Sequence, residues 1–305
     1  MVEIKVLYAG LCGSDIAKIN NDPHTNIRHL GHEIVGCPIN DDKSCYVINP
    51  FVNSEEYDDK DENESLLFCP HCMSLGKQLP GGFGQKVTIP SRNMWEFNVD
   101  EKYKCVGTLV DGIAVILHGL HLVNINNAKN ILVIGDGVIG CLATYVIKKT
   151  YPGINIKIFV RNEKKIELLN KLFDKEIIEK LDDIEKYDYV FECVGGSQSE
   201  TLNTAINVVN KNGTIVVYGA FSERIETVIN YRKLFYKQIT LKGINSYCNK
   251  YDDFEKAVDF AKQNHKDLYT FITQEIQFDN LEKYIYNEMK YDRNRIKTVF
   301  VNGQY

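Results

Sequence analysis

From residue 130 onward, apolar segments alternate with amphipathic ones, and this alternation constrains the fold more than any other feature of the chain. The segments with the composition of buried strands are 130–135, 155–160, 187–194, 213–219 and 239–244. The segments with helical spacing are 138–149 and 163–173. Strands that alternate with helices predict parallel strands joined by crossover helices. We therefore expect an α/β protein with a doubly wound parallel sheet in this part.

The chain before about residue 118 has a different character. Its apolar segments are short and are separated by Gly, Pro, Asn and Asp, which is typical of a mainly β region. Residues 53–65 form an acidic run, which we interpret as a solvated loop. We therefore expect two domains, and a chain of 305 residues is long enough to form both.

Composition limits the partners of the protein. A hydrophobic fraction of 44% and a charged fraction of 25% are those of an ordinary globular protein. The formal net charge of −5 argues against nucleic acid, which needs a basic surface. No uninterrupted apolar run approaches the roughly 20 residues of a membrane span, so we expect no membrane partner. Nine cysteines without an export signal predict a cytoplasmic location.

The segment G-D-G-V-I-G has glycines at Gly135, Gly137 and Gly140. It follows an apolar strand and opens a helix, which is the context of a dinucleotide-binding motif. The glycines permit a tight turn, close approach of a pyrophosphate and close packing of helix on strand. A glycine-rich turn without a ligand is the alternative. The other expected cofactor-binding residues are Val138, Ile139, Val194, Gly195 and Gly219.

The end of the second strand selects the dinucleotide. NAD-binding folds carry an acidic residue there, about 20 residues past the glycines, whereas this chain has Arg161. A guanidinium binds a 2′-phosphate bidentately, and Lys164 and Lys165 add positive charge. We therefore expect NADP(H) rather than NAD(H), the alternative being that Arg161 merely faces solvent.

A candidate metal site precedes this domain. The segment G-L-C-G-S-D places Cys12 between two glycines, and L-G-H-E-I-V-G contributes His32 and Glu33. A thiolate, an imidazole and a carboxylate together suit tetrahedral Zn²⁺. A lone histidine is more often structural, but the combination with an upstream cysteine favours a metal.

With these motifs the chain resembles the zinc-dependent medium-chain alcohol and polyol dehydrogenases. The matching segments are G-L-C-G-S-D, G-H-E-I-V-G, P-G-G-F-G-Q-K-V, T-L-V-D-G-I-A-V-I-L-H-G and G-D-G-V-I-G, in the order of the family. The resemblance implies a GroES-like β-rich catalytic domain over 1–112 and 265–305, with a Rossmann domain over 113–264. It implies a homodimer joined through sheet edges near I-T-L-K-G-I. Family members usually have a further strand before G-x-C-G-S-D, so we expect this chain to begin at the second strand of that hairpin.

The resemblance also implies roles for single residues. Cys12 and His32 would bind one catalytic zinc, with Glu33 as a ligand or a nearby carboxylate. The remaining protein ligand would be Asp111, which is one methylene shorter than the glutamate of polyol branches. Ser14 would bind the substrate oxygen and pass its proton on. The histidine of the family relay is missing, so the proton would leave through water or a group such as His24.

The chain departs from the family at the second, structural zinc. The four-cysteine spacing falls on Glu55, Asp58, Asp61 and Cys69, so only one thiolate remains and we expect no structural zinc. The cysteines that we interpret as core residues are Cys37, Cys45, Cys105, Cys141, Cys193 and Cys248.

Within the family, the cofactor domain looks most like NADPH-dependent ribulose-5-phosphate reductases, which form ribitol-5-phosphate for cell-surface polysaccharides. The leading hypothesis is a zinc- and NADPH-dependent reductase of a ketose or ketose phosphate. A phosphorylated substrate would use basic residues, for which Lys18, Arg28 and Lys86 are candidates. The alternatives are an NAD-dependent sorbitol- or threonine-type dehydrogenase and an inactive dinucleotide-binding protein.

Overall fold

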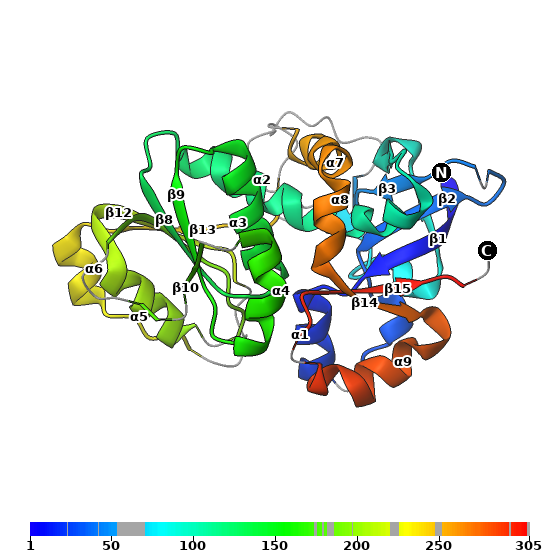
Figure 1. Ribbon diagram of the computed structural model, residues 1–305. Helices are drawn as coiled ribbons and strands as arrows, with labels where there is room; N and C mark the ends of the chain where they lie inside the picture. Colours follow the sequence, from blue (N-terminus) through cyan, green and yellow to red (C-terminus); the bar gives the residue numbers. More distant parts are fainter. Residues whose placement is uncertain are drawn as a thin grey trace. The chain divides into compact units, whose positions relative to one another are not determined.

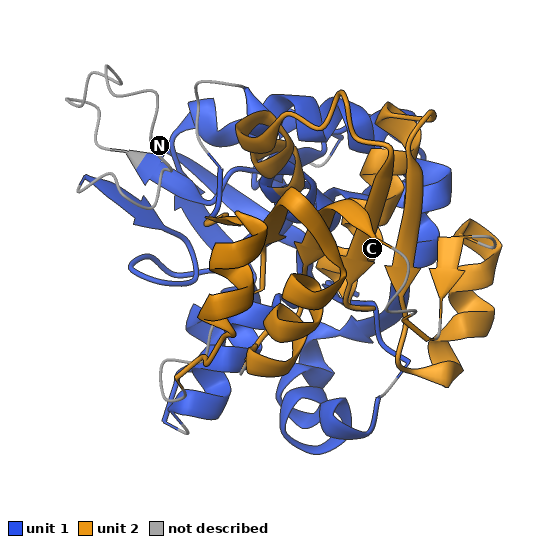
Figure 2. Ribbon diagram, turned by 90° about the vertical axis from the view of Figure 1, so that its left-hand side faces the viewer, with its two compact units in different colours: residues 1–115, 246–305 blue, residues 116–245 orange. Residues whose placement is uncertain are grey.

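The chain forms two compact units, shown in Figure 2. The structure is a computed structural model, and the residues it describes are 1–22, 24–41, 43–53, 71–173, 176–178, 180–181, 186–196, 198–219, 226–247, 252–292 and 294–303. Unit 1 comprises residues 1–115 and 246–305, and unit 2 comprises 116–245. The acidic run beyond residue 53, with Glu55, Asp58, Asp61 and Cys69, lies outside the described residues, as does Cys248.

The boundaries of the units differ from the expected domains chiefly at residues 246–264. We expected this stretch in the dinucleotide domain, whereas it groups with unit 1. The reason is aromatic packing within unit 1. The ring of Phe254 lies 5.0 Å from that of Trp95 and 5.7 Å from that of Tyr247, measured between centroids.

Unit 2 is built on a parallel sheet, as expected. Within the described residues its strands follow the order β10-β9-β8-β11-β12-β13, and every neighbouring pair is parallel. Figure 1 labels β8, β9, β10, β12 and β13 of this sheet. Their bounds are β8 Asn130–Ile134, β9 Asn155–Phe159, β10 Ile177–Ile178, β11 Tyr187–Glu192, β12 Val209–Val217 and β13 Thr240–Gly243. Counted along the chain, the order is 3-2-1-4-5-6, that of the doubly wound dinucleotide-binding fold.

Helices cover both faces of this sheet because the side chains of a strand alternate between them. The described helices that lie wholly within unit 2 are α3 Val138–Thr150, α4 Glu163–Phe173, α5 Ser199–Val208 and α6 Tyr231–Lys237. Leu202 and Ile206 of α5 share a hydrophobic cluster with Leu132 of β8. Gly140 of α3 lies against Val133, the next residue of β8, on the other face. The first turn of α3 thus sits directly after the central strand.

Unit 1 is the β-rich part, as expected, and its strands pair mainly antiparallel. Its main sheet runs β14-β15-β1-β2-β3-β7, with β6 also paired to β1 and with β4 and β5 forming a separate pair, among the described residues. The bounds are β1 Val2–Gly10, β2 Glu33–Pro38, β3 Tyr46–Ile48, β4 Phe51–Asn53, β5 Cys72–Ser74, β6 Lys86–Ile89, β7 Met94–Glu96, β14 Ile272–Gln277 and β15 Lys297–Val301. Its α-helices are α1 Gly13–Asn21, α7 Asp253–Gln263, α8 His265–Leu268 and α9 Leu281–Lys283. The register of β1 on β2 places Gly10 opposite Glu33.

A long apolar helical stretch begins in unit 1. The 3₁₀ segment Glu101–Leu109 continues directly into α2, Val110–Val123. By length and composition alone, residues Glu101–Val123 could cross a membrane, but 67% of their most apolar window is buried inside the protein. This stretch is therefore packed as a core helix.

Candidate functional site

Three of the expected metal ligands lie together in unit 1. One donor atom each from Cys12, His32 and Glu33 lies within 4.8 Å of the other two. Cys12 follows the end of β1, and His32 and Glu33 stand where β2 begins. Because β1 and β2 are antiparallel, the end of one strand meets the start of the other. A thiolate, an imidazole and a buried carboxylate fit the donor preference of zinc, so this group can hold the ion that the sequence predicts.

Asp15 holds two of these ligands in place. Its Oδ1 lies 3.6 Å from His32 Nδ1, and its Oδ2 accepts a hydrogen bond of 3.1 Å from the main-chain N–H of Cys12. Burial would raise the pKa of Asp15, but the charge of His32 lowers it overall. A carboxylate on one imidazole nitrogen leaves the other free for a metal. Sequence analysis gave Asp15 no role, although it stands in the G-L-C-G-S-D motif.

Glu33 has a buried cationic partner that the sequence did not reveal. Lys297 Nζ donates to Glu33 Oε2, and the two side chains are 1% and 5% exposed. Lys297 also donates to the carbonyl oxygen of Leu11, at 3.5 Å. Burial raises the pKa of Glu33, although Lys297 opposes this. A side chain at Gly10 would collide with both residues, which explains a glycine at the end of β1.

Asp111, the expected further ligand, is not in the group of three. It lies in the first turn of α2, where its Oδ1 accepts a hydrogen bond of 3.2 Å from the hydroxyl of Tyr247. The oxygen of the same hydroxyl also lies 3.3 Å from Asn49 Oδ1, so the two acceptors share its one proton. Burial and the charge of Asp111 raise the pKa of Tyr247 well above its usual value. The carboxylate of Asp111 also raises the pKa of Glu33, so it lies near the group, and its role as a ligand stays a prediction.

The other residues expected around the reaction centre are placed as follows. Ser14 is half-buried in the first turn of α1, two residues after Cys12. His24 is exposed. Of the candidate phosphate-binding residues, Arg28 Nε lies 3.2 Å from Glu282 Oε1 and Lys86 Nζ lies 3.9 Å from Glu3 Oε1, whereas Lys18 is exposed on α1.

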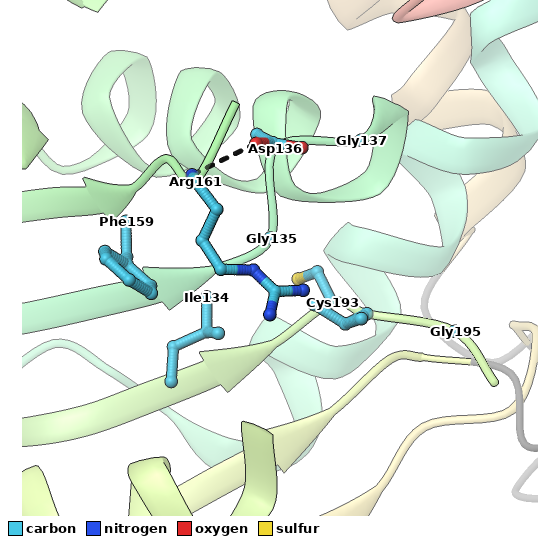
Figure 3. A pocket seen from close by; sticks show the side chains of 9 residues that line it. Ile134, Gly135, Asp136, Gly137, Phe159, Arg161, Cys193 and Gly195 are labelled. Carbon is cyan, nitrogen blue, oxygen red and sulfur yellow. Dashed lines mark hydrogen bonds between the residues drawn. The ribbon is translucent and has the colours of Figure 1, made fainter. Parts of the chain in front are cut away.

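Five of the ten expected cofactor residues, Gly135, Gly137, Arg161, Val194 and Gly195, line a hollow of about 190 Å³ at the carboxyl ends of the central strands of unit 2 (Figure 3). The residues lining it are Ile134, Gly135, Asp136, Gly137, Phe159, Arg161, Cys193, Val194 and Gly195. Gly135 has φ +124°, a conformation open to glycine but rarely to other residues. Gly137 precedes the first turn of α3, and a Cβ added to it would meet no atom within 4 Å. The N-terminus of α3 therefore has room for a phosphate.

Arg161 crosses this pocket. Its side chain extends from the end of β9 toward Cys193 (Figure 3). The side chain is 55% exposed, and Nη1 lies 3.7 Å from Glu200 Oε1. Lys164 is exposed on the first turn of α4. Lys165 is instead buried and hydrogen-bonded to Asp136, whose carboxylate balances the positive charge that we expected Lys165 to add.

The remaining cofactor residues lie at strand ends or helix starts. Val138 and Ile139 open α3. A side chain at Gly219 would collide with the carbonyl oxygen of Val194. At the end of β11, the buried Glu192 accepts a hydrogen bond of 3.1 Å from the main-chain N–H of Val194. Glu192 is a further residue that sequence analysis missed.

Most of the remaining cysteines are core residues, as predicted. Cys37, Cys45, Cys105 and Cys141 are buried. Cys193 is half-buried and lines the pocket described above, so its interpretation as a core residue was wrong. It follows the last residue of β11, where the strand leaves the core.

Comparisons with known proteins agree with this arrangement. A family model described as zinc-binding dehydrogenase matches residues 139–263. The sorbitol dehydrogenase of Halalkalibacterium halodurans is 24% identical over an alignment of 313 positions, which covers 92% of this chain and 86% of the relative. Ribulose-5-phosphate reductase 1 of Staphylococcus aureus is 25% identical over 278 residues, which cover 86% of this chain and 79% of the relative.

Solved structures share the fold. The crystal structure of S. aureus TarJ in complex with NADPH has a TM-score of 0.75 to this chain at 21% identity, covering 98% of this chain and 90% of TarJ. The expected fold class, a GroES-like β-rich part with a Rossmann sheet, is thereby confirmed. Residues 139–263 match the zinc-binding dehydrogenase family model and the relatives are named dehydrogenases and reductases, so the chain is an oxidoreductase similar to the zinc-binding dehydrogenases.

Proposed function

We propose that this protein is a zinc-dependent, NADPH-linked reductase that converts a ketose or ketose phosphate to the polyol, with ribulose-5-phosphate as the best candidate. The observation that carries this proposal is the group of Cys12, His32 and Glu33, whose donor atoms lie within 4.8 Å of one another. Two relatives support the substrate class: one is named a ribulose-5-phosphate reductase and the other a sorbitol dehydrogenase.

The metal would be held by Cys12 and His32, with Glu33 and Asp111 as the nearby carboxylates. When bound, the zinc ion polarises the substrate carbonyl and the nicotinamide supplies the hydride. Asp15 orients the imidazole of His32, and Lys297 fixes the carboxylate of Glu33. Ser14, on the first turn of α1, is the group we propose to bind the substrate oxygen and to move its proton toward solvent.

The dinucleotide would be held by unit 2. The main-chain N–H groups at the start of α3 would bind the pyrophosphate, because a helix N-terminus stabilises an anion. We infer that Arg161 binds the 2′-phosphate of NADP(H), because Arg161 is the basic residue among the described residues that line the pocket. A 2′-phosphate would have to compete with Glu200 for this guanidinium.

One observation favours a second candidate, an NAD-dependent polyol dehydrogenase of the sorbitol type. Glu200 Oε1 lies 3.7 Å from Arg161 Nη1 and balances part of its charge. In that case the guanidinium would be engaged by Glu200, and the pocket would take a nucleotide with a free 2′-hydroxyl.

The test measures the zinc content and the rate of substrate turnover on the same preparation of purified protein. We expect about one zinc per chain, as in a catalytic site without a second structural ion. NADPH oxidation is then followed with ribulose-5-phosphate, ribulose and fructose, and each assay is repeated with NADH. Turnover of the phosphorylated ketose with NADPH supports the proposal. Sorbitol oxidation is assayed in the reverse direction with NAD⁺ and with NADP⁺. Turnover of sorbitol with NAD⁺ alone supports the second candidate, and absence of zinc contradicts both.

We also infer that the protein is a homodimer that joins through the free edge of the sheet in unit 2. The terminal strand β13 is exposed along its whole length, and an open edge strand is a template for pairing. The exposed apolar side chains of β13 and of the chain that leads into it are Val228, Tyr231, Phe235, Tyr236 and Leu241. Sedimentation should give a dimer that Leu241→Glu and Phe235→Glu both weaken. A monomeric wild type would contradict the inference.

A further inference from the structure

The carboxylate of Asp136 connects two loops of the pocket in unit 2, the loop after β8 and the turn after β9, by hydrogen bonds. Asp136 stands between Gly135 and Gly137, in the loop after β8. Its Oδ2 accepts hydrogen bonds from the main-chain N–H groups of Arg161 and Asn162, both at 3.2 Å. The first of these bonds is the dashed line in Figure 3. The glycine loop is therefore attached directly to the turn from which the Arg161 side chain starts.

A buried lysine neutralises this carboxylate. Lys165 Nζ lies 3.3 Å from Asp136 Oδ1 and donates to the main-chain oxygen of Asp136 at 2.8 Å. The side chains are 8% exposed for Lys165 and 21% for Asp136. An unpaired carboxylate at this loop would repel a bound phosphate, and at such exposure the repulsion is weakly screened. The ion pair with Lys165 therefore removes the repulsion that the carboxylate of Asp136 would otherwise exert on a phosphate bound at this loop.

The turn itself is closed by further hydrogen bonds. The main-chain N–H of Lys165 donates to the main-chain oxygen of Asn162 at 2.8 Å. The main-chain N–H of Lys164 donates to the side-chain oxygen of Asn162 at 3.2 Å. These hydrogen bonds hold the start of α4 against the end of β9, and Asp136 attaches this turn to the glycine loop. A small displacement of the turn would move the Cα atom of Arg161. Binding of a ligand by the guanidinium would then weaken, because a binding site requires precise placement of its side chains.

We propose that Asp136, neutralised by Lys165, is a positioning residue that fixes the Arg161 turn and so gives the pocket its preference for a nucleotide with a 2′-phosphate. This inference rests on the proposed function, in which Arg161 binds that phosphate. Asp136 acts through the main chain of Arg161 and not by touching the phosphate.

Two variants of Asp136 separate positioning from charge. Asp136→Ala and Asp136→Asn remove the same negative charge, but the amide oxygen of asparagine still accepts hydrogen bonds from the two N–H groups. Calorimetric titration with 2′,5′-ADP and 5′-AMP gives the dissociation constant of 5′-AMP divided by that of 2′,5′-ADP, and this ratio measures the 2′-phosphate preference. We expect Asp136→Ala to lower this ratio by about tenfold, and Asp136→Asn to keep it within about threefold. Charge alone predicts that both variants bind 2′,5′-ADP more tightly.

A second pair of variants tests the lysine. Lys165→Met leaves the carboxylate of Asp136 unpaired, so we expect a lower ratio here too. Lys171→Met removes the same charge from an exposed position on α4 and serves as the matched control. Melting temperatures confirm that each variant is folded. If Lys165→Met does not fold, the two Asp136 variants decide the question.

The outcomes distinguish this inference from the proposed function. A wild type that binds the two probes alike, or Arg161→Met that keeps the preference, overturns the NADP(H) assignment and the inference with it. A wild-type preference that Arg161→Met abolishes and Asp136→Ala retains overturns the positioning role alone. Equal weakening of both probes in Asp136→Ala shows a merely structural role and also overturns it. A lower ratio in Asp136→Ala, restored in Asp136→Asn, supports it.

Discussion

Lys297 and Glu33 form a buried ion pair although 264 residues separate them in the chain. Lys297 opens β15 and Glu33 opens β2, and both strands pair with β1. Removing one partner of a buried pair leaves an uncompensated charge. We expect Lys297→Met to lower the free energy of unfolding by about 3–5 kcal/mol.

The double variant Lys297→Met with Glu33→Gln tests the cause of that loss. It removes both charges, so we expect it to recover more than half of the stability, as measured by urea denaturation of the metal-free protein. Equal stability of the single and double variants would show that lost packing of the lysine stem, not the unpaired carboxylate, causes the effect.

Cys12 is expected to be essential for metal binding. The thiolate is the softest donor of the group, and a serine hydroxyl is a much weaker zinc ligand. Cys12→Ser should reduce the zinc content, measured by plasma mass spectrometry, from about one ion per chain to a small fraction. Cys72→Ser, at a half-buried cysteine outside the group, serves as the control. Because zinc binds the folded state, a chelator should lower the melting temperature of the wild type but not that of Cys12→Ser.

The local elements of unit 2 could be predicted closely from the sequence. A helix over 138–149 and a strand over 155–160 were expected, and α3 is Val138–Thr150 while β9 is Asn155–Phe159. Continuous apolar strands and glycines that end them fix such elements locally. The start of β12 was missed by four residues, because N-K-N-G has the composition of a turn, whereas Val209 pairs with Tyr187 of β11.

The partners within the site could not be predicted in the same way. Lys297 is the first residue of β15, and nothing in the neighbouring sequence shows that it faces Glu33 across β1. Asp15 and Asp136 stand inside motifs, but their roles depend on which N–H groups the fold brings near them. A lysine in an otherwise apolar strand and an acid in a phosphate-binding loop are the signals that indicate such partners.

Two glycines of the cofactor motif should respond differently to alanine. A Cβ on Gly137 meets no atom within 4 Å, and its φ of −83° suits any residue. Gly137→Ala should therefore keep the wild-type melting temperature but weaken NADPH binding, because the methyl group occupies the space for the pyrophosphate. A Cβ on Gly140 would collide with the main-chain oxygen of Gly135.

Gly140→Ala should therefore lower the free energy of unfolding by about 1–3 kcal/mol, the usual cost of overpacking. Fluorescence titration with NADPH and thermal denaturation of the two variants check both expectations. A strong loss of stability in Gly137→Ala would mean that the space at α3 is not free for a ligand.

Glu192 should make the stability of unit 2 depend on pH. Burial raises the pKa of Glu192 to about 7, and hydrogen bonds from Thr201, Val194 and Gln198 only partly oppose this. The unfolded chain has the lower pKa, so between pH 4.5 and about 7 the folded state binds more protons than the unfolded state. The contribution of Glu192 to stability is thus fully present below pH 4.5 and is lost as the pH rises through about 7. At 1.36 kcal/mol per pH unit, this loss is on the order of 3 kcal/mol.

The variant Glu192→Gln removes this titration. We expect the stability of the variant to change less between pH 5 and 8 than that of the wild type. As the pH rises, the wild type should therefore lose stability relative to the variant. Melting temperatures in this range, compared with those of Glu167→Gln on the exposed face of α4, give the measurement. Parallel curves for wild type and Glu192→Gln would mean that Glu192 is ionised throughout. The hydrogen bonds from Thr201 and Gln198, each 2.8 Å long, would then outweigh its burial.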